Sequence, residues 1–254
     1  MPDINREIYN KYYSDHNVRL QPRTAYDRWM VDFRFSLIDR YGTGRDVLDL
    51  GCGTGSYLIP VLDRVRSAIG VDFSANMLAG FRRNLQGRRP AHLFLVEADT
   101  AELPLAPRSV DFVYSYTTLY HVSRVRSALQ EVGRVLRPGG YAALEMGNLY
   151  SLNTVVCLVQ HRRANWARPF HISYGHMFRY LREAGLDVVE RRTFQLLTMY
   201  GVPRPLFFLY PLTGSFWKRI MGRQVGGRLL DEWISGSWPL RYLAFRHMFI
   251  CQRV

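Results

Sequence analysis

The sequence predicts an α/β protein with an open, mostly parallel sheet and helices on both faces. Short apolar runs of strand length alternate five times with segments that repeat apolar residues at helical spacing. A turn with three glycines, at residues 51–55, directly follows the first run. Ligands of such sheets bind beyond the carboxyl ends of the strands, so the turn lies where a ligand is expected.

Seven strands are expected. The alternating runs are 45–50, 67–72, 91–96, 110–115 and 141–146, and two further strands are expected at 186–194 and 242–254. The five alternating runs are short, apolar and of strand length.

The clearest helix lies between the fourth and fifth runs. Apolar residues recur there at i, i+4, i+7 and i+11 from Val125 onward. Ser123 is expected to cap its start, and Pro138 with the two glycines after it is expected to end it. A second helix is expected at 174–184, closed by Gly185.

Composition excludes several classes of protein. With 254 residues, 48% of them hydrophobic, the chain can bury a large core. Cys52, Cys157 and Cys251 are too scattered for a zinc site, so no metal is expected and a reducing, cytoplasmic location is favoured. The polar N-terminus does not resemble a signal peptide, and no run of 18 apolar residues predicts a membrane span.

The glycine turn, in "VLDLGCGTGSY" (47–57), distinguishes between nucleotide-binding motifs. A dinucleotide fingerprint needs a third glycine where Ser56 stands, and no Gly-Lys-Ser/Thr follows to make a phosphate-binding P-loop. The spacing is instead D-x-G-x-G-x-G from Asp49 to Gly55. This pattern predicts a tight turn whose backbone closely approaches a ligand.

Five segments in register resemble the class I S-adenosylmethionine (SAM) dependent methyltransferases, in particular the ubiquinone/menaquinone-type and small-molecule group. They are "VLDLGCGTGSY", "AIGVDFSANML", "VEADTAELPLAPRSVDFVYS" and the last helix-turn-strand block "LYHVSRVRSALQEVGRVLRPGGYAALE". The third of these quotations covers two motifs. The resemblance spans about residues 40–147 and implies a Rossmann-like class I methyltransferase fold.

The resemblance implies SAM as cofactor, with S-adenosylhomocysteine as product. Backbone N–H groups near the glycines and a helix N-terminus after Gly55 suit the carboxylate of the methionyl group, and Asp49 suits its ammonium. Asp72 can accept both ribose hydroxyls, and Asp99 is expected at the adenine amino group. The full expected donor site is Asp49, Gly51, Cys52, Gly53, Gly55, Asp72, Phe73, Met77, Asp99, Thr100 and Tyr116. Asp111, early in its strand, is interpreted as structural.

A general base is needed only if the acceptor is a hydroxyl or an acidic carbon. His121, just after the fourth strand, stands where the resembling family often has a histidine facing the acceptor. His171, His176 and Glu145 are the alternatives. A packing role for each of these side chains stays open.

The expected organisation is an N-terminal helical cap (1–40) over the donor site and a methyltransferase domain (41–254). Tyr9, Tyr12 and Tyr13 are expected to close over the donor. Within the domain, 148–173 and 196–241 are expected to be insertions on the acceptor side.

The acceptor is expected to be a small or amphiphilic molecule, methylated at oxygen or carbon. The basic excess of the net charge of +13 lies in residues 151–254, and 196–241 mixes aromatic residues such as Phe207, Phe208 and Trp217 with Lys218 and Arg219. This composition is compatible with peripheral contact to an anionic membrane. The alternatives are an RNA methyltransferase, although the sequence has no RNA-binding module, and a SAM-binding regulatory protein without turnover. The oligomeric state is not predicted.

Overall fold

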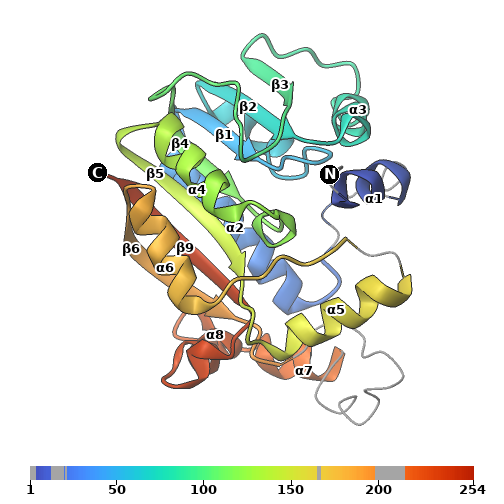
Figure 1. Cartoon of the computed structure of the whole chain (residues 1–254), viewed down its shortest axis with the longest axis vertical. Coiled ribbons are helices and arrows are strands. Elements are labelled where there is room, and N and C mark those ends of the chain that lie inside the picture. Colours follow the sequence, from blue (N-terminus) through green and yellow to red (C-terminus); the bar gives the residue numbers. More distant parts are fainter. Residues whose placement is uncertain (1–3, 13–19, 21, 165–166, 198–214) are drawn as a thin grey trace.

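The computed structural model describes residues 4–12, 20, 22–164, 167–197 and 215–254. At its centre is a seven-stranded sheet in the order β3-β2-β1-β4-β5-β9-β6 (Figure 1). The strands are β1 (Asp46–Leu50), β2 (Ser67–Asp72), β3 (Leu93–Glu97), β4 (Val110–Ser115), β5 (Leu136–Gly147), β6 (Leu186–Phe194) and β9 (Arg246–Arg253). β1 to β5 pair in parallel, whereas β9 runs antiparallel between β5 and β6. The predicted fold class is confirmed.

Helices cover both faces of this sheet. The α-helices are α1 (Ile4–Tyr12), α2 (Ala25–Gly42), α3 (Ala75–Asn84), α4 (Val125–Val135), α5 (Leu152–Ala164), α6 (Tyr174–Glu183), α7 (Ser215–Met221) and α8 (Leu230–Gly236). Three short 3₁₀ helices, η1 (Ile59–Arg64), η2 (Leu119–His121) and η4 (Leu240–Tyr242), and a small hairpin, β7 (Gln224–Val225) with β8 (Arg228–Leu229), complete the described part. Figure 1 shows α4 and α6 together over one face, with α2 behind the sheet.

The strands are buried on both faces, which explains their nearly continuous apolar sequences. In β4, Phe112 and Tyr114 pack into the core beneath α2, while Val113 between them packs into the core beneath α4 and α6. Because successive side chains of a strand point to opposite faces, one short run contributes to two cores.

Two expected helix boundaries are wrong. Arg124, not Ser123, precedes α4, and no side chain caps that end. The helix ends at Val135, and β5 already includes Pro138. No α-helix begins after Gly55 either, because the chain forms turns and then the six-residue 3₁₀ helix η1. The predicted 174–184 helix is confirmed as α6, with Gly185 at a φ of 67° after its end.

The expected boundary at residues 40 and 41 falls inside α2. Met30 and Leu37 of α2 are buried in the core against the sheet, so this helix is part of the sheet's own covering layer. α1 contacts α3 instead. Tyr13 lies outside the described residues, as does the side chain of Tyr12.

Asp111 lies at the amino end of β4, away from the glycine turn. Asp111 and Asp46 both pair with Arg66 and Arg137. Asp111 lies 2.8 Å from Arg66 and 2.7 Å from Arg137. The pKa of Asp111 is lowered because its hydrogen bonds and Arg137 together outweigh the opposing effect of burial. The structural interpretation of Asp111 is therefore confirmed.

Among the residues that the structure describes, no helix combines the length and the apolar composition needed to cross a membrane.

Gly133 allows α4 to pack closely against the end of α6. A Cβ atom at this position would overlap the carbonyl oxygen of Ala184, which is backbone and cannot rotate away. We expect Gly133→Ala to lower the free energy of unfolding by about 1–3 kcal/mol, the usual cost of overpacking. Denaturant unfolding followed by circular dichroism measures it.

Gly175 provides the matched control, because it lies in α6 with no atom within 4 Å of its Cβ position. Gly175→Ala should be neutral or stabilise by up to ~1 kcal/mol, since alanine restricts the unfolded chain. Equal stabilities for the two variants would contradict the close contact between α4 and α6.

Candidate functional site

A cavity of about 430 Å³ lies at the carboxyl ends of the central strands. The segments after β1, β2, β3 and β4 all reach it, because these neighbouring strands run parallel. Ten of the eleven predicted donor-site residues line it: Asp49, Gly51, Cys52, Gly53, Asp72, Phe73, Met77, Asp99, Thr100 and Tyr116. Their role in binding stays a prediction, but the structure brings them to one place.

Each glycine of the turn has a different neighbour. All three have positive φ angles, between 52° and 84°. A Cβ on Gly51 would collide with the side chain of Thr118, and one on Gly55 would lie 2.7 Å from the ring of Phe81. Only Gly53 has open space at its Cβ position. Gly55 does not line the cavity, so its expected ligand contact is wrong, and the reason for a glycine there is internal packing.

Asp72, at the end of β2, is held by two backbone donors. Its Oδ2 accepts a hydrogen bond from the N–H of Gly53 at 2.9 Å, and its Oδ1 accepts one from Ser74 at 2.9 Å. Burial raises the pKa of Asp72 to about 6 even though these hydrogen bonds favour the carboxylate. The carboxylate thereby also fixes the glycine turn.

Asp49, at the end of β1, has less hydrogen bonding than Asp72 to offset the burial of its carboxylate. Its Oδ2 accepts a hydrogen bond from the hydroxyl of Tyr114 at 3.0 Å. Burial, with a smaller contribution from Asp72, raises the pKa of Asp49 to about 8. A positive charge bound beside this carboxyl would favour its ionised form and lower its pKa.

Asp99 follows β3 and is partly exposed. Its Oδ1 accepts a hydrogen bond from the N–H of Ala101 at 2.8 Å, and its Oδ2 lies 3.0 Å from the guanidinium of Arg124. The ring of Tyr9, from α1, meets Phe73 edge-on at 5.6 Å above this end of the cavity. We call Asp49, Asp72 and Asp99 the acidic side of the cavity.

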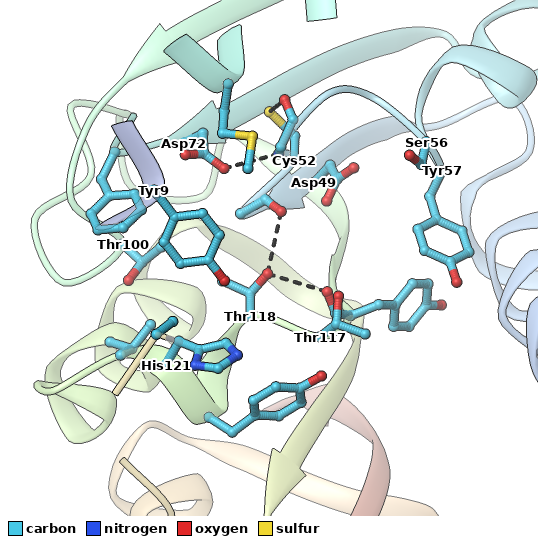
Figure 2. A pocket seen from close by; sticks show the side chains of 18 of the residues that line it. Tyr9, Asp49, Cys52, Ser56, Tyr57, Asp72, Thr100, Thr117, Thr118 and His121 are labelled. Carbon is cyan, nitrogen blue, oxygen red and sulfur yellow. Dashed lines mark hydrogen bonds between the residues drawn. The ribbon is translucent and has the colours of Figure 1, made fainter. Parts of the chain in front are cut away.

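Two histidines lie on the other side, beyond the ends of β4 and β5. His121 is in η2 and His171 lies between α5 and α6. Burial lowers the pKa of His121 to about 4 and that of His171 to about 3, where the charge of His121 adds to the effect. Both imidazoles are neutral at pH 7. Figure 2 shows His121 across the cavity from Asp49 and Asp72. We call His121 and His171 the imidazole side.

The other two candidate bases, Glu145 and His176, do not line the cavity. Glu145 is fully buried in β5 outside the cavity lining, with its Oε2 2.6 Å from Arg34 and its Oε1 2.9 Å from Arg246. Both carboxylate oxygens of Glu145 are therefore engaged by guanidinium groups away from the cavity, and the described geometry gives no support to its expected role as a base. His176 is exposed on α6, where its Nδ1 contacts the hydroxyl of Ser173 at 2.6 Å.

Several further residues line the cavity that the sequence motifs do not predict. Arg34 comes from α2, donates to the hydroxyl of Tyr57 at 2.7 Å, and has its pKa raised because Glu145 outweighs the opposing effect of burial. Thr117 has a φ of 58°, which is strained for a β-branched residue. The other missed lining residues are Leu20, Thr54, Ser56, Thr118, Tyr120, Val122, Ser123, Ala167 and Phe245, together with Cys157, which had been noted only as a scattered cysteine. Of these, Thr54, Ser56 and Tyr57 lie inside the glycine motif, and those at 117–123 lie in or beside the last motif.

The two segments expected to be acceptor-side insertions differ in whether they line the cavity. The segment 148–173 contains α5 and contributes Cys157, Ala167 and His171 to the cavity. No described residue of 196–241 lines it. Instead Lys218 of α7 pairs with Asp27 of α2 at 2.8 Å, and Asp231 of α8 accepts a hydrogen bond from Tyr26 at 2.7 Å.

The described part of 196–241 therefore covers the core beside α2 and is not an acceptor-side element. Phe207 and Phe208 lie outside the described residues.

Comparison with known proteins identifies the central part of the chain. Residues 48–144 match the family model described as a methyltransferase domain. A demethylmenaquinone methyltransferase from Shouchella clausii is 32% identical over 142 residues, which cover 54% of this chain and 58% of that protein. A 2-phytyl-1,4-naphtoquinone methyltransferase from Trichormus variabilis is 36% identical over 105 residues, covering 40% of this chain and 46% of that one. The chain thus spans about half the length of these relatives.

A solved structure is similar in fold. The structure described as the [4+2]-cyclase SpnF superposes with a TM-score of 0.63 at 17% identity, covering 99% of this chain and 93% of that one. At this identity the likeness concerns the fold alone. Since that neighbour is described as a cyclase, the fold does not by itself define the reaction.

Glu145 compensates two buried guanidinium groups, and this generates a stability prediction. Its side chain is 0% exposed and that of Arg34 is 6% exposed. Glu145→Gln leaves both arginines without a counter-charge, so we expect the free energy of unfolding to fall by about 3–5 kcal/mol. Asp39→Asn removes the half-exposed pair with Arg64 and should cost less than ~1 kcal/mol. Urea unfolding of both variants checks this, and a loss at Glu145 no larger than at Asp39 would contradict it.

Proposed function

We propose, from the match of residues 48–144 to a methyltransferase domain, that the protein is a class I SAM-dependent methyltransferase that binds SAM and transfers its methyl group to a small or amphiphilic molecule. The observation that carries this proposal is the division of one cavity into an acidic side and a neutral imidazole side. The cationic donor suits the first, and an uncharged acceptor suits the second.

The acidic side fits the polar groups of SAM. Each oxygen of Asp72 receives one backbone hydrogen bond and retains a lone pair that can accept from a ribose hydroxyl. Asp49 would hold the ammonium group, Asp99 would accept from the adenine amino group, and the open space at Gly53 leaves room for the ligand beside the turn. When bound, SAM supplies a methyl group on a positively charged sulfur, and the chain mainly has to align the acceptor with it.

An apolar, aromatic wall supports a small or amphiphilic acceptor. The cavity is also lined by Leu20, Tyr120, Ala167 and Phe245, and the rings of Tyr120 and Phe245 lie beside His171 at 6.1 Å and 5.0 Å between centroids. The two relatives described above are named for quinone substrates, and such molecules combine an oxygenated ring with apolar surface. We extend this class of acceptor, a hydroxylated or oxygenated amphiphile, to the present chain.

The competing functions have weaker support. The charge of Lys218, expected to face an anionic membrane or RNA, is paired with Asp27, which reduces its contribution to either surface. A SAM-binding protein without turnover would have no use for two unprotonated imidazoles opposite the donor site. Release of S-adenosylhomocysteine in the presence of an acceptor would exclude that last alternative.

Asp72 gives a direct test of donor binding. Calorimetry should show SAM and S-adenosylhomocysteine binding at micromolar concentration or below, and no measurable binding of NAD. Asp72→Ala removes hydrogen bonds to a charged acceptor worth ~1.5–3 kcal/mol, so affinity should fall tenfold or more. The control Asp111→Ala alters a carboxylate at the opposite end of the sheet and should leave affinity unchanged. Saturable NAD binding without SAM binding would refute the proposed function.

Asp49 gives a second test through proton release. With a pKa of about 8, this carboxyl is mostly protonated at pH 7, and a bound ammonium favours the ionised form and lowers its pKa. SAM binding at pH 7 should therefore release up to one proton that Asp49→Asn does not release, and this difference should vanish above pH 9. Calorimetry in buffers of different ionisation enthalpy measures it. Equal proton release by the two proteins would place the ammonium away from Asp49.

A further inference from the structure

A chain of hydrogen bonds fixes the tautomer of His171. The hydroxyl of Thr154 donates to the carbonyl oxygen of Asn148 at 2.6 Å, and the same oxygen lies 2.7 Å from Nδ1 of His171. A hydroxyl has a single hydrogen, and a carbonyl can only accept. Thr154 must therefore accept from His171, which places the imidazole hydrogen on Nδ1 and leaves Nε2 unprotonated.

The unprotonated Nε2 has no hydrogen-bond partner among the described residues. His171 is only 9% exposed, and it lines the cavity on the imidazole side. A buried lone pair without a donor is costly, so a site of this kind is completed by a ligand or a water molecule. A hydroxyl group of the acceptor is a donor of the required kind.

The His171 ring is also held in position. The main chain beside it pairs with the end of β5: Ile172 donates to the carbonyl oxygen of Gly147 at 3.2 Å, and Leu149 donates to that of Ile172 at 3.0 Å. A Cβ on Gly147 would lie 2.7 Å from Cδ2 and 3.2 Å from Nε2 of His171, so only glycine leaves room for the ring. The ring of Phe245 packs against it in a T-shaped contact with 5.0 Å between the ring centroids.

The groups around the imidazole keep it neutral. The groups that face it are the ring of Tyr120 at 6.1 Å, the ring of Phe245, the hydroxyl of Thr154, and His121, whose charged form would repel a proton on His171. Because burial and His121 lower the pKa of His171 to about 3, its lone pair is available throughout the neutral range. Protonation would compete only as the pH falls towards that value.

We propose that Nε2 of His171 is the general base of this protein, that Thr154 positions it by fixing its tautomer, and that the acceptor reacts through a hydroxyl group. The inference rests on the proposed methyl transfer. As the hydroxyl oxygen forms its bond to the methyl carbon, the bond from that carbon to the sulfur of SAM breaks and S-adenosylhomocysteine leaves. The hydroxyl proton passes to Nε2, and the resulting imidazolium returns it to water.

The weakness of this base determines the substrate class. An oxygen that is gaining a methyl group becomes a strong acid, so even a weakly basic imidazole can take its proton during transfer. An unactivated carbon would need a full carbanion first, which such a base cannot generate. An amine is a cation at neutral pH, and on this side it would meet neutral imidazoles and the buried guanidinium of Arg34 instead of a carboxylate.

Nuclear magnetic resonance of protein labelled with ¹⁵N-histidine tests the tautomer without any turnover. In the complex with S-adenosylhomocysteine, the resonances lost in His171→Gln identify this ring. We expect the Nδ1–H tautomer from pH 8 to pH 5 in the native protein and in Thr154→Ser, whose hydroxyl can make the same bonds. Thr154→Val, which cannot accept, should lose this preference. An Nε2–H tautomer in the native protein, or an unchanged tautomer in Thr154→Val, would overturn the proposal.

A matched pair of small probes tests the substrate class in the same sample. Benzyl alcohol should shift the Nε2 resonance of His171, because its hydroxyl donates to the lone pair, and benzylamine should not. A shift of His121 Nδ1 alone, the other unpartnered ring nitrogen on the imidazole side, would move the base to that residue and overturn the proposal, as would no response to the alcohol or an equal response to both probes. SAM calorimetry is independent of these outcomes, so a failure of the proposed function is distinguishable from a failure of this inference.

Discussion

The parallel pairing of β1 with β2 and β4 is the constraint on which the cavity depends. It places the chain reversals after these strands at one edge of the sheet, so that Asp49, Asp72 and Tyr116 meet although they are far apart in sequence. The strands hold these reversals rigidly because they are buried on both faces. A pocket built on such ends is largely preformed, which keeps the entropy lost on ligand binding low.

Sheet order then divides the cavity electrostatically. β3, β2 and β1 are consecutive neighbours and carry the acidic side at their ends, whereas β4 and β5 lead to the imidazole side. Burial affects the two sides in opposite ways, since it raises the pKa of Asp49 and lowers that of His171. Both shifts favour the neutral form, as expected where water is excluded. A cationic donor restores charge on the acidic side only, and this asymmetry gives the cavity its polarity.

The glycine turn illustrates how a motif can be recognised for one reason and be required for another. The spacing from Gly51 to Gly55 indicates a ligand, yet the space beside Gly51 is filled by Thr118 and that beside Gly55 by Phe81. Only Gly53 faces open space, and its N–H is already bound to Asp72. Two of the three glycines therefore permit the turn to pack against the protein itself, and the carboxylate that would bind the ribose also stabilises the turn.

The sequence by itself determined the seven strands, their α/β order and most residues of the acidic side of the cavity, because these features depend on contiguous runs of apolar residues and on short motifs whose parts lie within a few residues of each other. Only the tertiary structure decided the rest. Arg34 reaches the cavity from α2, outside every recognised motif, and Glu145 is held away from the cavity by Arg34 and by Arg246, about a hundred residues later. Thr154 and Asn148 act on His171 only in the folded chain, where the Thr154 hydroxyl lies between the carbonyl oxygen of Asn148 and Nδ1 of His171. Local patterns define which element a segment forms, but the proton position and charge of a buried group depend on neighbours that the chain supplies from distant segments.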